Sequence, residues 1–347
     1  MALEHGTLRG AFARQVARYC RRVTTGPASS AVAGGAGAEG AETRRFVCVT
    51  GMHRSGTSAV ARVLDLLGVD FGDRADLLGG LHDNPEGFWE SLPIVRLDEA
   101  LLWRAGGSWD DPPWLDDGWE SEPALDDART TAERLVDRAF VSGSVAGWKD
   151  PRTSLVLPFW RTVVSVDRTV LVLRDPREVA RSVAVRNRFG PERAAYLWLR
   201  YTVAAWRADS TRVVVSYDDL LRDPWATTRY LAGALELPTP DDAVEAGVGE
   251  AVRAELRHGD GVRSAGPVMR LAVAHHDLLA SGDWAGVDAA SEDLRARWAA
   301  VRRRDRRWRR PRVLARRLAP WGVRRRIRSR VGAVTSLALR RATVPVR

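Results

Sequence analysis

Short apolar runs alternate with segments of helical periodicity through the middle of the chain. Four runs are apolar, β-prone and short enough for buried strands: residues 46–50, 144–148, 169–173 and 212–216. Apolar positions recur at helical spacing in residues 59–67, 178–187 and 192–208. Strands that alternate with helices predict a parallel sheet covered by helices on both faces.

The same pattern divides the chain into four parts. Residues 44–240 are predicted to form a three-layer α/β/α domain with a central, mostly parallel sheet. Residues 241–300 have helical patterns and no strand pattern, which predicts a helical C-terminal extension. Residues 1–43 combine a basic stretch with a Gly/Ala-rich run and indicate a flexible arm, whereas residues 301–347 form an Arg-rich tail.

Composition limits the class of protein. The 347 residues suffice for one α/β domain with extensions. The two cysteines, Cys20 and Cys48, form neither a disulfide framework nor a zinc-binding spacing, which favours a reducing compartment. No apolar run reaches the length of a membrane span, and arginines interrupt any apolar core near the N-terminus. We therefore expect a cytoplasmic protein, with peripheral contact to a membrane as an open question.

The net charge of +10 is concentrated in the tail. Residues 301–347 carry +17, so the remaining 300 residues carry −7. A specific nucleic-acid-binding domain would carry its positive charge on the folded module, so we do not expect a nucleic-acid partner. The tail mixes arginines with Trp308, Trp321 and Ile327, as in an interfacial helix on anionic lipid. A disordered basic tail, or one bound to an acidic partner, has the same composition.

The loop at residues 51–58 is the first candidate binding site along the chain. Gly51 and Gly56 bracket it, a predicted strand precedes it, and an amphipathic helix follows. In this context the backbone N–H groups converge in front of the positive end of a helix dipole. The loop is therefore predicted to hold a tetrahedral anion, as in a P-loop-type fold.

Two features separate this loop from the loops of nucleotide triphosphatases. Thr57 stands where those enzymes need the lysine that reaches the β- and γ-phosphates. The third predicted strand ends in Arg174 and Asp175, where the arginine disfavours a magnesium ion. We therefore predict anion binding without a metal. A P-loop kinase or NTPase and a non-catalytic nucleotide-binding scaffold remain the alternatives.

The loop resembles the 5′-phosphosulfate loop of sulfotransferases that use 3′-phosphoadenosine 5′-phosphosulfate (PAPS), with Arg54 at the usual lysine position. Residues 170–182 resemble a second motif of that family, a strand followed by an arginine and then a serine. Similarity to a bacterial branch spans about residues 45–237 and includes residues 84–90, 149–152, 197–201 and 215–221. The resemblance implies sulfuryl transfer from PAPS to a hydroxyl of a glycan, a glycolipid or another small metabolite.

The resemblance also implies roles for single residues. The loop would hold the 5′-phosphosulfate, and the second motif would hold the 3′-phosphate. The donor-binding residues implied are Gly51, His53, Arg54, Ser55, Gly56, Thr57, Ser58, Arg174 and Ser182. Such transfer is an in-line displacement, in which the protein positions the reactants and neutralises charge.

Lys149 is the one lysine among 54 basic residues. All other basic residues are arginines, so the lysine at this position indicates a site that accommodates a compact ammonium group and not a planar guanidinium. We expect Lys149, together with Arg54, to stabilise the charge that develops on the departing 5′-phosphate.

The general base is not determined by the sequence. Cytosolic family members use a histidine two residues beyond a lysine, and Pro151 occupies that position here. Each candidate carboxylate could equally form a structural ion pair with Arg54 or Arg152. The candidate bases are Glu90, Glu86 and Asp150, followed by His82.

Two aromatic features have structural and functional interpretations. Residues 103–119 hold four tryptophans among acids, glycines and prolines, which indicates a loop that either binds a sugar or caps the core: Trp103, Trp109, Trp114 and Trp119. His275 and His276 lie in a helical pattern without acids or cysteines at metal spacing, so a core or solvent-facing pair is predicted there.

Overall fold

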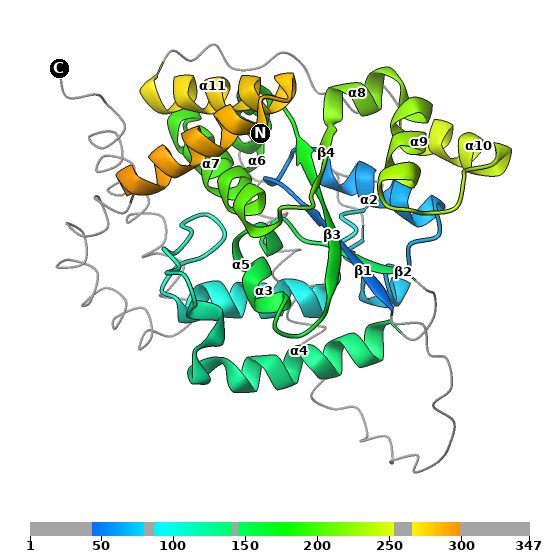
Figure 1. Ribbon diagram of the computed structural model, residues 1–347, viewed down its shortest axis with the longest axis horizontal. Coiled ribbons are helices and arrows are strands. Elements are labelled where there is room, and N and C mark those ends of the chain that lie inside the picture. The colour runs from blue at the N-terminus through cyan, green and yellow to red at the C-terminus, as the bar shows by residue number, and fades with distance from the viewer. Residues whose placement is uncertain (1–43, 80–86, 141–144, 253–265, 299–347) are drawn as a thin grey trace, which may run out of the picture. The chain divides into compact units, whose positions relative to one another are not determined.

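The computed structural model describes residues 44–79, 87–140, 145–252 and 266–298 (Figure 1). In these residues four strands form one sheet in the order β2-β1-β3-β4. Every neighbouring pair is parallel, as predicted. The strands are β1 (Arg45–Thr50), β2 (Val145–Lys149), β3 (Val166–Leu173) and β4 (Val213–Ser216).

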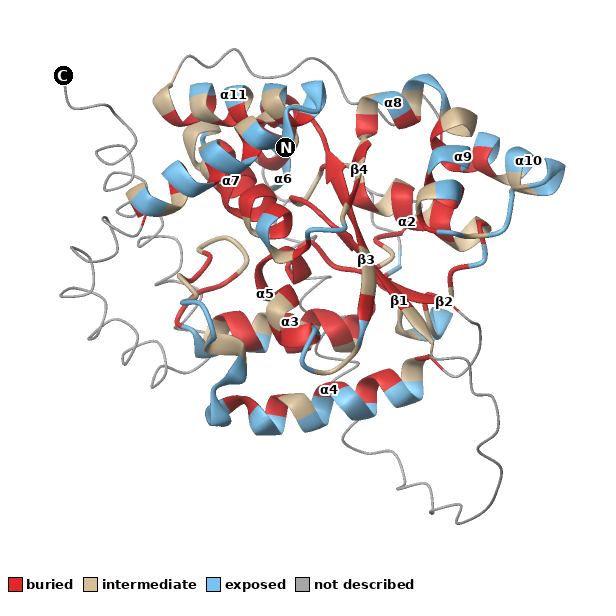
Figure 2. Cartoon of the chain, in the orientation of Figure 1, coloured by how far each residue is buried: buried red, intermediate tan, exposed pale blue. Residues whose placement is uncertain are grey.

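The strands bury both of their faces, so successive side chains of one strand enter different cores. In β1, Phe46 and Cys48 belong to one buried cluster, whereas Val47 and Val49 belong to the other. In the burial view of Figure 2 the strands are buried over most of their length. Near-continuous apolar strands of this kind are the reason why a parallel sheet needs a helical layer on each side.

Helices form the two outer layers (Figure 1). One layer packs through its apolar residues on the Val47 face of the sheet: α2 (Thr57–Leu66), α8 (Tyr217–Arg222), α9 (Pro224–Ala234) and α10 (Asp242–Ala251). The other layer packs on the Phe46 face: α3 (Leu92–Arg104), α4 (Asp126–Ala139), α5 (Thr153–Trp160), α6 (Pro176–Asn187), α7 (Pro191–Ala208) and α11 (Pro267–Ser281). A further helix covers residues 284–298. Three short 3-10 turns complete the described elements: η1 (Arg74–Asp76), η2 (Trp119–Ser121) and η3 (Pro123–Leu125).

The predicted three-layer α/β/α class is confirmed, with shifted element boundaries. Strand β2 runs to Lys149, one residue beyond the predicted end, and β3 begins three residues before the predicted start. Trp103 was predicted in a loop but lies in α3, because that helix continues to Arg104. The predicted arm at residues 1–43 and the Arg-rich tail lie outside the described residues. Within the described part, no helix has the length and apolar composition needed to cross a bilayer.

The strand order determines where a ligand can bind. From β1 the chain first adds β2 on one side and then β3 on the other. Ligands of open parallel sheets bind outside the carboxyl ends of strands at such a reversal. The residues that follow β1 and β3, beginning at Gly51 and Arg174, lie at this position.

Candidate active site

The loop after β1 has the backbone of an anion cradle. Gly51 has a φ of 131°, and a Cβ at this position would lie 2.7 Å from the carbonyl oxygen of Val172. Its N–H donates to Oγ of Ser154 at 2.9 Å, which ties the loop to helix α5. Glycine is therefore required at the point where the chain leaves the sheet.

The second half of the loop leads into helix α2. Gly56 has a φ of 91° and precedes Thr57, the first residue of that helix. The Oγ atom of Ser55 is buried and has no hydrogen-bond partner among the described residues. A buried hydroxyl that lacks a partner beside a helix N-terminus fits a bound anion. Ser58 differs from this pattern, because its hydroxyl donates to the carbonyl oxygen of Phe88 at 3.1 Å.

Arginines from the loop and from the end of β3 meet beside helix α6. Nε of Arg54 donates to Oγ of Ser182 at 2.8 Å. Nη1 of Arg174 donates to the backbone oxygen of Arg54 at 3.2 Å, while its Nε donates to Glu178 at 3.0 Å. The fold thus brings together three residues that lie up to 128 positions apart in the sequence.

Tyr217 covers this group from the end of β4. Its ring lies 4.8 Å from the guanidinium carbon of Arg174. A Cβ on Gly56 would lie 2.0 Å from Cδ2 of the same ring. We did not single out Tyr217 from the sequence, although its place directly after a strand puts it at the edge where the other loops lie.

Lys149 and Glu90 form a buried ion pair at the end of β2. The Nζ atom of Lys149 lies 2.7 Å from Oε1 of Glu90, and the two side chains are 1% and 9% exposed. Burial alone would raise the pKa of Glu90, but Lys149 and Arg152 outweigh it and hold this pKa below its usual range. Glu90 is therefore ionised. Glu86, the neighbouring candidate, lies outside the described residues, as does His82.

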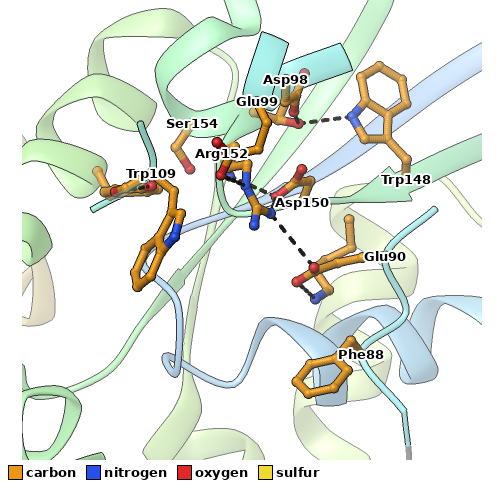
Figure 3. A network of polar contacts seen from close by, with 12 residues as sticks. Phe88, Glu90, Asp98, Glu99, Trp109, Trp148, Asp150, Arg152 and Ser154 are labelled. Atoms are coloured by element: carbon orange, nitrogen blue, oxygen red, sulfur yellow. Dashed lines mark hydrogen bonds and ion pairs between the residues drawn. The ribbon is translucent and has the colours of Figure 1, made fainter. Parts of the chain in front are cut away.

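Arg152 gathers three carboxylates around its guanidinium group, as Figure 3 shows. Its Nη1 lies 2.7 Å from Asp150 and 3.8 Å from Glu90, and its Nε lies 2.9 Å from Glu99. Burial raises the pKa of Asp150 despite the opposing charge of Arg152. The sequence suggests Arg54 or Arg152 as the ion-pair partner of the candidate carboxylates. In the structure Arg152 pairs with both Asp150 and Glu90.

Helix α3 places Glu99 in this group through its neighbour Asp98. The buried carboxyl group of Asp98 accepts hydrogen bonds from Trp160 Nε1 at 2.7 Å and from the Thr153 hydroxyl at 2.8 Å. Both donors belong to helix α5. The two helices are thus fixed against each other, and Glu99 reaches Arg152.

His53, in the loop after β1, lies beside two aromatic side chains. Its ring stands at a steep angle to Trp109 and Tyr201, with centroid separations of 4.9 and 5.5 Å. The hydroxyl of Tyr201 donates to the backbone oxygen of Trp109 at 2.8 Å, so helix α7 holds the loop that carries this tryptophan. Tyr201 is a second residue that we did not single out from the sequence.

The predicted tryptophan loop divides into different environments. Trp109 contacts His53 and stacks on Phe189 at 5.9 Å. Trp114 packs against Arg200, whose guanidinium carbon lies 3.9 Å from the ring centroid, and against Trp298. Trp114 therefore caps the core, and Trp109 is the member of the set that faces the loop at residues 51–58.

Among the described residues, no three His, Cys, Asp or Glu side chains are arranged to hold a metal ion. Asp175, at the end of β3, accepts from the N–H of Arg177 at 2.7 Å as the cap of helix α6. His275 is buried between helices and contacts Trp198, so the predicted core position is confirmed for this histidine.

The sequence model of the sulfotransferase family matches residues 47–241, more than half of the chain. The chain belongs to the sulfotransferase family. The matched residues include most of β1, the loop after it, Lys149, and the segment from Arg174 to Ser182. A search of curated proteins gives no significant match.

Several solved structures show a limited similarity to this sulfotransferase. STF9 from Mycobacterium avium has 16% identity and a TM-score of 0.38, over 68% of this chain and 71% of that one. STF1 from Mycobacterium tuberculosis H37Rv has 17% identity and a TM-score of 0.35, over 60% and 72%. The sulfotransferase domain of the Synechococcus PCC 7002 olefin synthase has 15% identity and a TM-score of 0.36, over 68% and 96%.

Proposed function

We propose that this sulfotransferase moves the sulfuryl group of PAPS to a hydroxyl of a glycan, a glycolipid or another small metabolite. The observation that supports this most is the hydrogen bond between Arg54 and Ser182, with Arg174 beside it. It places two guanidinium groups and a hydroxyl next to a glycine-bracketed loop. A donor with separate 5′ and 3′ anionic groups needs such a pair of neighbouring sites.

In this proposal different residues bind the two anionic ends of the donor. The 5′-phosphosulfate is surrounded by the backbone of Gly51, His53 and Gly56, by the start of helix α2 at Thr57, and by the free hydroxyl of Ser55. Ser58 contributes its backbone N–H, since its hydroxyl is bound to Phe88. Arg174 and Ser182 hold the 3′-phosphate.

Charge on the departing 5′-phosphate is neutralised by Arg54 and by the buried Lys149. In-line displacement spreads negative charge over the transferred group and the leaving oxygen, and fixed cations in a site of low dielectric stabilise that charge. Glu90 keeps the ammonium of Lys149 in place at 2.7 Å. Asp150 and Glu90 both orient Arg152, so we assign these two carboxylates to positioning.

Thermal stability and turnover together test the proposal. Adenosine 3′,5′-bisphosphate without magnesium should raise the melting temperature of the full chain, and labelled sulfate should pass from PAPS to members of a panel of sugars, phenols and alcohols. Stabilisation by Mg·ATP alone would indicate the P-loop kinase alternative. Stabilisation by adenosine 3′,5′-bisphosphate with no sulfate transfer and no PAPS cleavage would indicate a nucleotide-binding scaffold.

The proposed cellular location is cytoplasmic, with peripheral membrane contact through the Arg-rich tail. The support is the sequence alone, because residues 301–347 lie outside the described part of the chain. Co-sedimentation with vesicles of anionic lipid at low and physiological salt measures this contact, and the chain truncated after residue 300 is the control. Equal sedimentation of the two forms would contradict a role of the tail.

A further inference from the structure

His53 has an unusual environment for a residue of an anion-binding loop. The residue as a whole is partly exposed, yet its Nε2 atom is buried and has no hydrogen-bond partner within the described residues. Nearly all buried polar atoms in folded proteins have a partner, so an exception at a ligand site suggests that a ligand supplies it. The steep ring contacts with Trp109 and Tyr201 hold the imidazole in one orientation.

The charges around His53 keep its ring neutral. Burial lowers the pKa of His53 well below its usual range, and four cations add to this effect. These cations belong to several parts of the fold: Arg152 follows β2, Arg186 lies on α6, Lys149 on β2, and Arg54 in the loop itself. Tyr201 on α7, whose own pKa is raised by burial, faces the ring as a neutral phenol. A neutral imidazole has one nitrogen that can accept a proton.

The carboxylates near the site are bound to cations. Glu90 gives Oε1 to Lys149, and Asp150 gives Oδ1 to Arg152. Glu90 is a weak base, because taking a proton would leave Lys149 without its counter-charge. Burial raises the pKa of Asp150, but this residue is 0% exposed, whereas His53 is partly exposed and can be approached by an acceptor. His53 loses no ion pair when it accepts a proton.

We propose that Nε2 of His53 accepts the proton of the acceptor hydroxyl during sulfuryl transfer. This rests on the proposed function and deepens it. The acceptor oxygen forms its bond to sulfur as the bond between sulfur and the 5′-phosphate oxygen breaks, and the electron pair of that bond leaves with the phosphate. The hydroxyl proton moves to His53. Because cations surround the resulting imidazolium, it returns the proton to water readily, and the ring is neutral again for the next turnover.

The acceptor has to reach a nitrogen that is buried in the structure. Trp109 is the neighbour best placed to allow this, because its side chain is half-buried while its backbone is held by Tyr201. Tyr201 is buried in helix α7 and stays in place. An acceptor would then lie against Trp109 and His53, with its hydroxyl toward the loop.

The His53→Gln variant of the full chain tests the proposal, because glutamine keeps hydrogen-bonding capacity and cannot act as the base. The rate of sulfate transfer from PAPS to the best acceptor of the panel should fall by about 10²- to 10⁴-fold, the usual contribution of a general base. The dissociation constant of adenosine 3′,5′-bisphosphate, measured by calorimetry, should stay within about threefold. His276→Gln, a histidine outside the site, is the control and should leave both quantities unchanged.

The pH profile separates a base from a structural residue. In the wild-type chain the transfer rate should stay constant well below pH 6.5 and fall only when His53 becomes protonated, since its pKa is lowered. That acid limb should be absent from the residual rate of His53→Gln. Near-wild-type transfer by the variant would overturn the role of His53 and leave the proposed function intact.

A joint loss of nucleotide binding and transfer in both His53→Gln and His53→Asn would also overturn the proposal, because it would show that the residue supports the loop. The absence of transfer and PAPS cleavage in the wild-type chain would instead overturn the proposed function itself. These outcomes are distinguishable because nucleotide binding and transfer are measured on the same samples.

Discussion

The ammonium of Lys149 and the carboxylate of Glu90 are 2.7 Å apart in a site nearly closed to solvent. Lys149 ends strand β2, whereas Glu90 precedes helix α3, so the pair joins the sheet to the chain that leads into the outer layer. Burial lowers the pKa of Lys149, and Glu90 partly offsets this. The pair therefore has both a structural and an electrostatic role.

Glu90→Gln should strongly destabilise the protein, because it leaves a buried ammonium without its counter-charge. Breaking a buried pair in this way typically costs about 3–5 kcal/mol. Urea unfolding measures the loss. Asp293→Asn, which breaks the solvent-exposed pair with Arg297, is the control and should cost less than about 1 kcal/mol. The double variant Glu90→Gln/Lys149→Met should recover part of the stability, and no recovery would contradict the assigned pairing.

Lys149→Arg should abolish most sulfate transfer even though the positive charge is kept. The side chain at this position is 1% exposed, and a guanidinium is both larger and planar, so it cannot occupy the place of a compact ammonium beside Glu90. Transfer from PAPS, measured with the unfolding midpoint of the same sample, checks this expectation. Wild-type turnover in Lys149→Arg would contradict the role of Lys149 in sulfate transfer.

Arg174→Ala should remove the preference for a 3′-phosphate. The wild-type chain should bind adenosine 3′,5′-bisphosphate more tightly than adenosine 5′-monophosphate, and the variant should reduce the ratio of the two dissociation constants by about 10- to 100-fold, the worth of a hydrogen bond to a charged group. Arg174→Lys keeps the charge without the planar fork and should have an intermediate ratio. An unchanged ratio in both variants would place the 3′-phosphate elsewhere.

The ends of the predicted strands gave the positions of Gly51, Lys149 and Arg174, because apolar runs and a glycine are local signals. The pairing of Lys149 with Glu90 has no such signal, since 59 residues separate the two. Tyr217 was not predicted either. Its contact with Gly56 depends on β4 pairing with β3, and the strand order is decided by packing rather than by local pattern.

Gly56→Ala should weaken both the fold and donor binding, whereas Gly68→Ala should weaken the fold alone. Both glycines have a left-handed backbone, with φ of 91° and 89°. Each substitution therefore costs about 1–2 kcal/mol from the backbone. A Cβ on Gly56 would also lie 2.0 Å from the Tyr217 ring, while nothing lies within 4 Å of one on Gly68. Calorimetry with adenosine 3′,5′-bisphosphate separates the two, and equal affinities would contradict the role of the Gly56–Tyr217 contact.

His275 should make the protein less stable in mild acid. It is 2% exposed, and burial followed by the nearby His276 lowers its pKa from 6.5 to about 4. As pH falls below 6.5 the unfolded chain takes up the proton first, so the penalty grows between pH 6.5 and 4, to about 3 kcal/mol at 1.4 kcal/mol per pKa unit. The His275→Leu variant lacks this titration. Between pH 7 and pH 4.5 the unfolding free energy of the wild type should therefore fall more than that of the variant. If the unfolding free energies of the two proteins changed in parallel with pH, His275 would not be the responsible group.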